Sequence, residues 1–226
     1  MRTARSMVPQ RLRSRSPRPC RARWLPSWLS GSTIGHYERH APDYLRFTVD
    51  HDIGESYAAF LAALDGTGGR RILDLGCGVG RDLRHFREAG YDAVGLDGSE
   101  AMAETARRLS RCPVWQQDLF ALDLPEGRFD GVFANASLFH VPPRRLPDVL
   151  VNLAHALKPG GILFACNPVG HDEEGWFGER YVCLYSQRSW SRLVRRSGFR
   201  RISLFHRPPG LPRRQQTWLA TLWRRI

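Results

Sequence analysis

Short apolar runs alternate with amphipathic stretches through the middle of the chain. Residues 72–75 form an apolar run suited to a strand that is buried on both faces, and residues 79–89 then carry apolar side chains at helical spacing and end before Gly90. The same alternation predicts further strands at 93–97, 113–117, 131–135 and 162–166, and helices at 99–109 and 146–157, the latter ended by Pro159-Gly160-Gly161. Strands that alternate with helices in this way are typical of an α/β fold with a parallel sheet.

The two ends of the chain depart from this alternation. Residues 35–64 precede the first strand and are expected to form a helical cap, whose second helix Gly66 would stop. After the parallel strands, a helix is predicted at 186–197 and strands at 200–206 and 216–223. No helix separates the last two strands, so they are expected to pair antiparallel at an edge of the sheet.

The segment between the first strand and its helix is a glycine-rich turn. Gly76, Gly78 and Gly80 follow a Gly-x-Gly-x-Gly spacing, whereas a dinucleotide fingerprint needs a small residue at the position that Arg81 occupies here. Asp74 lies two residues before the first glycine, and its charge would repel a diphosphate but favour an ammonium group, such as that of S-adenosylmethionine. A dinucleotide oxidoreductase is therefore disfavoured.

Two further acids follow later strands. Asp97 ends the second strand, 97 − 80 = 17 residues after the last glycine, where a carboxylate suits the paired hydroxyls of a ribose. Asp118 follows the third strand and could accept a hydrogen bond from an adenine amine. Any one such acid is also compatible with a plain helix cap or turn, but three acids at successive strand ends indicate an adenosyl site.

On these motifs the segment from about Arg70 to Gly161 resembles a class I S-adenosylmethionine-dependent methyltransferase. The motifs are Asp74-Leu-Gly-Cys-Gly-Val-Gly80, Leu96-Asp-Gly-Ser99, Gln117-Asp-Leu119, Phe129-Asp130 and Leu157-Lys-Pro-Gly-Gly161. The resemblance implies a Rossmann-like, doubly wound seven-stranded sheet of order 3-2-1-4-5-7-6, with strand 7 antiparallel and an N-terminal helical cap.

The resemblance also assigns roles toward S-adenosylmethionine as the methyl donor. It implies that Asp97 holds the ribose, that Asp118 and the Leu119 amide contact the adenine, and that Asn135 lies beside the methionine end or the sulfonium. Its remaining cofactor residues would surround the methionine moiety, and they are Asp74, Gly76, Gly78 and Gly80.

Two segments are candidates for binding the methyl acceptor. Tyr37 and Tyr44 lie in the predicted cap and are candidate pocket walls, although packing in the core would equally explain two aromatic residues there. Residues 170–185 form a polar and aromatic insert after a strand end, and Trp176 and Tyr181 are its pocket candidates. The acids of this insert could bind a cationic acceptor or belong to a solvated loop.

His140 is the candidate general base. It lies in the loop after the fourth strand, at the edge where ligands of open α/β sheets bind, and a neutral imidazole can take a proton near pH 7. The alternative is that His140 caps the loop or packs beneath the cofactor. Methyltransferases that act on the amino groups of adenine or glutamine carry an Asn-Pro-Pro-aromatic run at the fourth strand. Asn135 is followed by Ala-Ser instead, so the resemblance disfavours that substrate class.

The net charge of +12 is concentrated at the N-terminus. Residues 1–33 contain eight arginines and no acid, which leaves 34 − 8 = 26 basic against 22 acidic residues elsewhere, or +4. We expect residues 1–33 to be a disordered basic tail and residues 34–226 to be the methyltransferase domain. The tail is compatible with a transit peptide, with an anionic partner, or with no function. Within it, the spacing of Trp24, Leu25, Trp28 and Leu29 would place apolar groups on one helical face.

The cysteines and acids predict neither a metal site nor disulfides. The five cysteines form no Cys-x-x-Cys pair, and the neighbouring residues 171–174 on one loop are poorly placed to converge on an ion. An odd cysteine count without a secretory signal indicates a cytoplasmic protein, and no apolar run is long enough to span a membrane.

The sequence therefore predicts an enzyme that transfers a methyl group to a small-molecule acceptor. One alternative is the same reaction on tRNA or another RNA, with phosphate contacts from the basic tail and from Arg192, Arg195, Arg196, Arg200 and Arg201. A second alternative is a protein that binds S-adenosylmethionine without catalysis.

Overall fold

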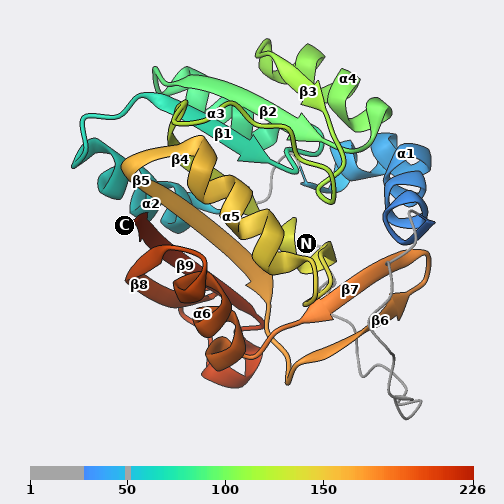
Figure 1. Cartoon of the computed structure of the whole chain (residues 1–226). Helices are drawn as coiled ribbons and strands as arrows, with labels where there is room; N and C mark the ends of the chain where they lie inside the picture. Colours follow the sequence, from blue (N-terminus) through green and yellow to red (C-terminus); the bar gives the residue numbers. More distant parts are fainter. Residues whose placement is uncertain (1–27, 49–51) are drawn as a thin grey trace.

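A seven-stranded mixed sheet forms the centre of the computed structural model, which describes residues 28–48 and 52–226 (Figure 1). Its strand order is β3-β2-β1-β4-β5-β9-β8. The first five strands are parallel, and β9 pairs antiparallel with both β5 and β8. The strands are β1 (Arg71–Leu75), β2 (Asp92–Asp97), β3 (Val114–Gln116), β4 (Phe129–Asn135), β5 (Leu157–Pro168), β8 (Phe199–Arg207) and β9 (Trp218–Arg225). The predicted order, with an antiparallel edge, is confirmed.

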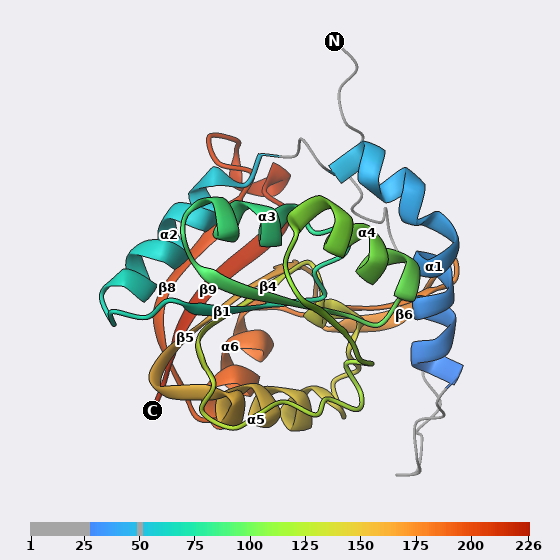
Figure 2. The ribbon, with the colours of Figure 1, turned by 90° about the horizontal axis from the view of Figure 1, so that it is seen from above.

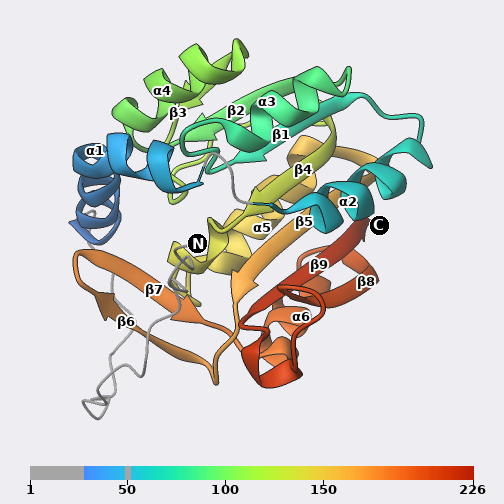
Figure 3. The same ribbon diagram turned by 180° about the vertical axis from the view of Figure 1, so that it is seen from behind.

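Helices cover both faces of the sheet, as the view from above shows (Figure 2). One face carries α2 (Gly54–Asp65), α3 (Arg81–Glu88) and α4 (Glu100–Ser110), of which α2 and α3 face the viewer in Figure 3. The other face carries α5 (Leu146–Ala156) and α6 (Gln187–Arg196). Serine residues cap the N-termini of α4 and α6. The hydroxyl of Ser99 accepts from the Met102 amide, and that of Ser186 accepts from the Ser189 amide.

The core is built on the apolar runs of the central strands. Phe133 of β4 and Phe164 of β5 stack with their ring centroids 4.4 Å apart, and Phe60 of α2 packs against them. Gly131 is required beneath that helix, since a Cβ there would lie 2.7 Å from the Phe60 ring. Strands that are buried on both faces read as continuous apolar runs, which is why the sequence located them.

Two segments lie at the carboxyl ends of the parallel strands (Figure 1). The first is α1 (Trp28–Thr48), and the second is a hairpin of β6 (Glu173–Phe177) and β7 (Arg180–Leu184). The hydroxyl of Thr33 accepts from the Tyr181 amide at 3.0 Å, so α1 and the hairpin are tied together. The short helix η1 (Leu138–His140) lies against β7, and a second one, η2 (Arg213–Gln215), precedes β9.

Three departures from the prediction change how the chain is organised, namely the start of the cap, the insert at 170–185 and the start of β5. Other predicted element ends shift by one or two residues. Helix α1 begins at Trp28, so residues 28–33 belong to the cap rather than to the predicted tail, in line with the apolar spacing noted at Trp28 and Leu29. Residues 1–27, for which disorder was predicted, lie outside the described residues. The insert at 170–185 forms a hairpin, which its polar composition did not indicate.

The third difference is at the start of β5. The expected break at residues 159–161 is instead part of this strand, which begins at Leu157 and shifts register against β4. Asp130 fixes the local geometry, because it accepts from the Lys158 ammonium at 2.7 Å and from the Arg71 amide at 2.9 Å.

The described parts of the chain, 28–48 and 52–226, contain no helix whose length and apolarity would allow it to cross a membrane.

Candidate functional site

The glycine turn between β1 and α3 forms the floor of the candidate site. Gly76, Gly78 and Gly80 all have positive φ, at 70°, 53° and 86°. A Cβ on Gly76 would lie 2.5 Å from that of Ser137, and one on Gly80 would lie 2.7 Å from the Ala106 backbone. A Cβ on Gly78 would have no atom of the described residues within 4 Å beyond those of its chain neighbours. The outer two glycines are therefore required by packing, while Gly78 faces open space that a ligand can enter.

Asp97 holds the turn and the next helix together at the end of β2. Its Oδ2 accepts from the Gly78 amide and its Oδ1 from the Ser99 amide, both at 2.9 Å. Burial raises the pKa of Asp97, and these amide donors oppose that effect by favouring the charged form. Each carboxylate oxygen has more than one lone pair, so both can still accept from a ligand hydroxyl.

Asp74 is buried beneath the same turn with an acceptor atom to spare. The residue is 1% exposed, and its Oδ2 has no hydrogen-bond partner among the described residues. Burial, followed by the charge of Asp82, raises the pKa of Asp74 well above its ordinary value. A bound cation would reverse this effect and favour the carboxylate.

A polar network beside Asp74 was not identified from the sequence. Asp82, in the first turn of α3, accepts from the Tyr57 hydroxyl and from Nε of Arg81, both at 2.6 Å. Asn135 donates to the other oxygen of Asp82 at 3.1 Å, which links the end of β4 to α3. The available signal was an acid directly after the glycine turn, where a helix N-terminus favours a negative charge.

Asp118 and Leu119 follow β3, next to Asp97. The Gln117 amide donates to the Asp97 carbonyl at 3.0 Å, which brings the two strand ends together. Asp118 accepts from the Phe120 amide at 2.9 Å, so it forms the local turn that was the alternative interpretation of this acid. Leu119 is partly buried against the core on the α5 side of the sheet.

His140 is 9% exposed, and both of its ring nitrogens are engaged. Nδ1 lies 2.6 Å from the carbonyl oxygen of Tyr181, so this nitrogen carries the hydrogen and donates. Nε2 lies 2.8 Å from the Tyr37 hydroxyl and therefore accepts from it. Burial lowers the pKa of His140 to about 4, against a smaller opposing effect of the Tyr181 carbonyl. The imidazole is thus neutral at pH 7, and its lone pair is directed at Tyr37.

The predicted pocket residues Tyr37 and Tyr44 are brought together on α1, with their ring centroids 5.1 Å apart. Arg180 joins them from the start of β7 and donates from a terminal nitrogen to the Tyr44 hydroxyl at 3.2 Å. The sequence analysis did not single out Arg180, because one arginine in a polar insert carries no distinguishing signal.

Trp176 and Tyr181 lie on the other face of the hairpin. They are cross-strand partners with ring centroids 5.4 Å apart, and Trp176 is 38% exposed. Side chains alternate along a strand, so Tyr181 points away from the side that Arg180 occupies. It is the backbone of Tyr181, rather than its ring, that contacts His140.

Helix α1 is anchored directly beside Asp97. Glu38 accepts from the Ser99 hydroxyl at 2.6 Å and from the Ala101 amide at about 3.1 Å, at the N-terminus of α4. A carboxylate at this position is favoured by the helix dipole. The cap is therefore fixed on the same residues that shape the glycine site. Within the described ranges, no three metal-ligating side chains are grouped so as to hold an ion.

A family model described as "Methyltransferase domain" matches residues 72–161. The trans-aconitate 2-methyltransferase of an Acidovorax species is 35% identical over 152 residues, which are 65% of this chain and 55% of the relative. The tRNA U34 carboxymethyltransferase of Idiomarina loihiensis is 33% identical over 178 residues, which are 70% of this chain and 54% of the relative. The chain spans about half the length of the curated relatives it matches.

Among solved structures, the chain is similar in fold to the 1,6-didemethyltoxoflavin-N1-methyltransferase of Burkholderia thailandensis. The TM-score is 0.71 at 21% identity, and the match covers 93% of each chain. That protein was crystallised with 1,6-didemethyltoxoflavin and S-adenosylhomocysteine.

Proposed function

Because the chain contains a class I S-adenosylmethionine-dependent methyltransferase domain, we propose that it transfers a methyl group from this donor to a small-molecule acceptor. The observation that carries the proposal is the pairing of a buried acid with an open glycine. Asp97 and Gly78 are joined by a hydrogen bond, and among the described residues nothing beyond the chain neighbours of Gly78 lies within 4 Å of the position that its Cβ would take. A carboxylate at this point suits a nucleoside without phosphates.

The residues present fit this donor. Asp97 has free lone pairs for the ribose hydroxyls, and Asp74 has a buried oxygen without a partner that suits an ammonium group. Asn135, held by Asp82, would lie toward the methionine end. Asp118 and the Leu119 amide would contact the adenine. These assignments extend the resemblance to positions that the fold brings together.

When bound, the donor supplies a methyl group already activated by the positive charge on sulfur. The tasks left to the chain are to orient the acceptor and to exclude water. Helix α1 and the β6–β7 hairpin are placed for both, at the carboxyl edge of the sheet. If His140 acts as a general base, the proton would have to pass by way of the Tyr37 hydroxyl, because that hydroxyl donates to Nε2, the ring nitrogen that carries the lone pair.

Binding of the donor is tested by calorimetry with S-adenosylhomocysteine, and with NAD as the competing ligand class. We expect binding of the first and none of the second, and the reverse result would overturn the proposal. Turnover is tested with methyl-labelled donor and fractionated cell extract. Label in small molecules supports the proposal, whereas donor binding without any transfer would identify a non-catalytic binding protein.

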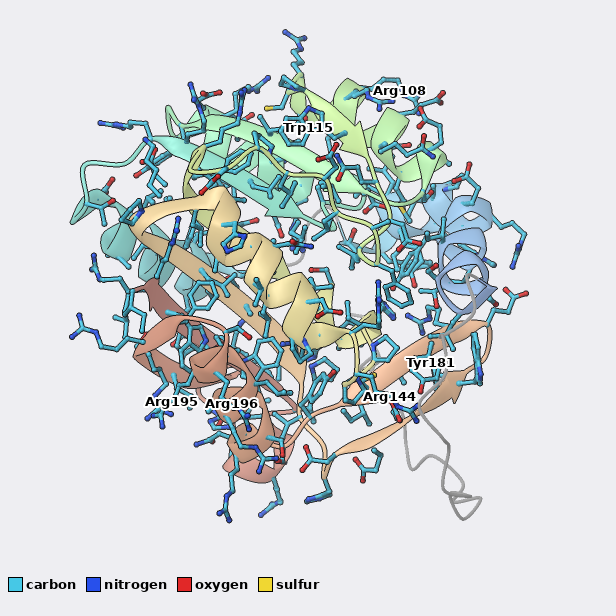
Figure 4. All side chains as sticks on the ribbon, viewed as in Figure 1. Arg108, Trp115, Arg144, Tyr181, Arg195 and Arg196 are labelled. Atoms are coloured by element: carbon cyan, nitrogen blue, oxygen red, sulfur yellow. The ribbon has the colours of Figure 1, made fainter. Side chains whose placement is uncertain are left out.

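RNA is a second candidate acceptor, favoured by one surface. Residues 186–226 contain eleven arginines and no acid. Among those of these arginines whose side chains the structure describes, none forms an ion pair. A hollow of about 490 Å³ at this edge is lined by Arg195, Phe199, Arg200, Arg201 and Ile226. Figure 4 shows Arg195 and Arg196 on α6, away from Tyr181 and the cap.

This candidate is distinguished by its salt dependence. If RNA binds here, affinity for total tRNA should fall steeply between 50 and 200 mM salt. In an Arg195→Gln, Arg196→Gln variant, the slope of log K against log salt concentration should be smaller in magnitude by about 2. Weak binding with the same slope in both proteins would exclude this surface.

The cytoplasmic setting remains a proposal, which the free state of the four described cysteines supports.

A further inference from the structure

The cap contains a guanidinium group that is only partly satisfied. Arg180 begins β7 and donates to the Tyr44 hydroxyl at 3.2 Å, and its guanidinium lies 5.4 Å from the centroid of the Phe177 ring. Its Nε is buried and has no hydrogen-bond partner among the described residues. A buried donor left unpaired is costly, and the cost is larger when the group is charged.

None of the carboxylates that the structure describes forms an ion pair with this guanidinium. Glu179, the neighbouring acid, is 54% exposed and accepts instead from Arg39 at 2.6 Å and from His36 at 3.3 Å. Within the described residues Arg180 forms no ion pair. The guanidinium is thus directed at the two tyrosines of α1, and no acid among the described residues pairs with it.

From this arrangement we infer that the methyl acceptor is an organic acid whose carboxylate binds Arg180 and the Tyr44 hydroxyl. The inference rests on the proposed function and specifies its substrate class. A planar guanidinium binds a carboxylate through two parallel hydrogen bonds. The Tyr44 hydroxyl accepts from Arg180 and keeps its own hydrogen, which it can donate to the same ligand.

Two acids of the hairpin region take part in local hydrogen bonds. Asp172 accepts from the backbone and hydroxyl of Ser186 and from the Ser189 hydroxyl, all at 2.9 Å. Glu173 accepts from the His171 amide at 2.7 Å. These contacts stabilise the hairpin and its junction with α6, and binding of a cationic acceptor by the acids of this insert stays the alternative prediction.

The imidazole that contacts Tyr37 does not add to the charge of Arg180. His140 is uncharged at pH 7, and its Nε2 accepts from Tyr37. Arg180 therefore supplies a positive charge beside the two tyrosines, and a carboxylate is ionised at that pH without help from a base.

The experiment uses methyl-labelled donor and the small-molecule fraction of a cell extract. The extract is first separated on an ion-exchange column, and each fraction is then tested as a source of acceptor. We expect the acceptor activity in the anionic fraction. This activity should disappear when carboxylates are first converted to neutral amides with a carbodiimide and methylamine, and should survive alkaline phosphatase. Activity in the neutral or cationic fraction, or activity removed by the phosphatase, would overturn the inference while leaving the proposed function intact.

Three variants assign the effect to Arg180. Arg180→Gln should lower kcat/KM for the anionic acceptor at least tenfold, and Arg180→Lys should recover part of the loss because it restores the charge. Arg46→Gln, which alters an exposed arginine of α1 that pairs with Asp43 on the same helix, should match the wild type. Affinity for S-adenosylhomocysteine should be equal in all four proteins, which also shows that each is folded. Wild-type kinetics of Arg180→Gln would refute the role of this residue, and loss of donor binding in the wild type would instead refute the proposed function.

Discussion

Burial of His140 should make the stability of the protein depend on pH in a defined window. Both ring nitrogens are used by neutral partners, and burial lowers the pKa of the imidazole from 6.5 to about 4. As the pH falls, His140 binds a proton at about pH 6.5 in the unfolded chain, but only at about pH 4 in the folded chain. The stabilisation is therefore fully present above pH 6.5 and is lost as the pH falls toward 4.

The magnitude follows from the difference between the two pKa values. At about 1.4 kcal/mol per unit of pKa, the full effect is about 3 kcal/mol. Between pH 7 and pH 5 the unfolded histidine becomes almost fully protonated while the folded one stays neutral, which corresponds to about 2 kcal/mol of this total. That is a substantial share of the 5 to 15 kcal/mol typical of a domain.

The assay compares urea unfolding of the wild type and His140→Asn at pH 7 and pH 5. The wild type should lose about 2 kcal/mol more than the variant over this interval, since the variant lacks the titrating group. Asp74 and Asp97 also titrate abnormally, but they do so in both proteins and cancel in the comparison. His155→Asn, at an exposed position on α5, should keep the wild-type pH dependence. Parallel curves for wild type and His140→Asn would show that the imidazole is not held neutral.

Two other predictions concern the donor site. Gly80→Ala should destabilise the protein by about 1 to 3 kcal/mol more than Gly90→Ala, because both have positive φ but only the first would place a Cβ 2.7 Å from Ala106. Equal losses in thermal unfolding would mean that backbone strain alone decides. Asp97→Asn should weaken binding of S-adenosylhomocysteine by about 1 to 3 kcal/mol, whereas Asp92→Asn, at the exposed start of the same strand, should not. Calorimetry with unchanged affinity for Asp97→Asn would remove this residue from the site.

The parallel half of the fold could be predicted because its signals are local. A doubly buried strand reads as a continuous apolar run, and a glycine turn with positive φ reads as closely spaced glycines. Asp97 and Gly78 are 19 residues apart and are joined across one strand–turn–helix unit. The first strand of the hairpin, β6, was missed because most of its residues are exposed, so it does not need the regular apolar spacing by which strands are identified.

The acceptor side could not be predicted in the same way, because its contacts join distant parts of the chain. Tyr37 and His140 are 103 residues apart in sequence, and Tyr44 and Arg180 are 136 apart. No periodicity or spacing within either segment indicates these pairs, which form only when α1 and the hairpin meet above the sheet edge.

This division has a functional consequence. The proposed donor site lies on strands β1, β2 and β4, whose positions are fixed by a shared core, so a change there should disturb the whole sheet. The proposed acceptor side lies on α1 and the β6–β7 hairpin, which are attached to that edge and to each other. Substitutions at Arg180 or Tyr44 can therefore alter which acceptor binds without altering how the donor binds. On this reasoning, acceptor specificity and donor affinity should vary independently in this protein, and Arg180→Gln is the substitution that separates them.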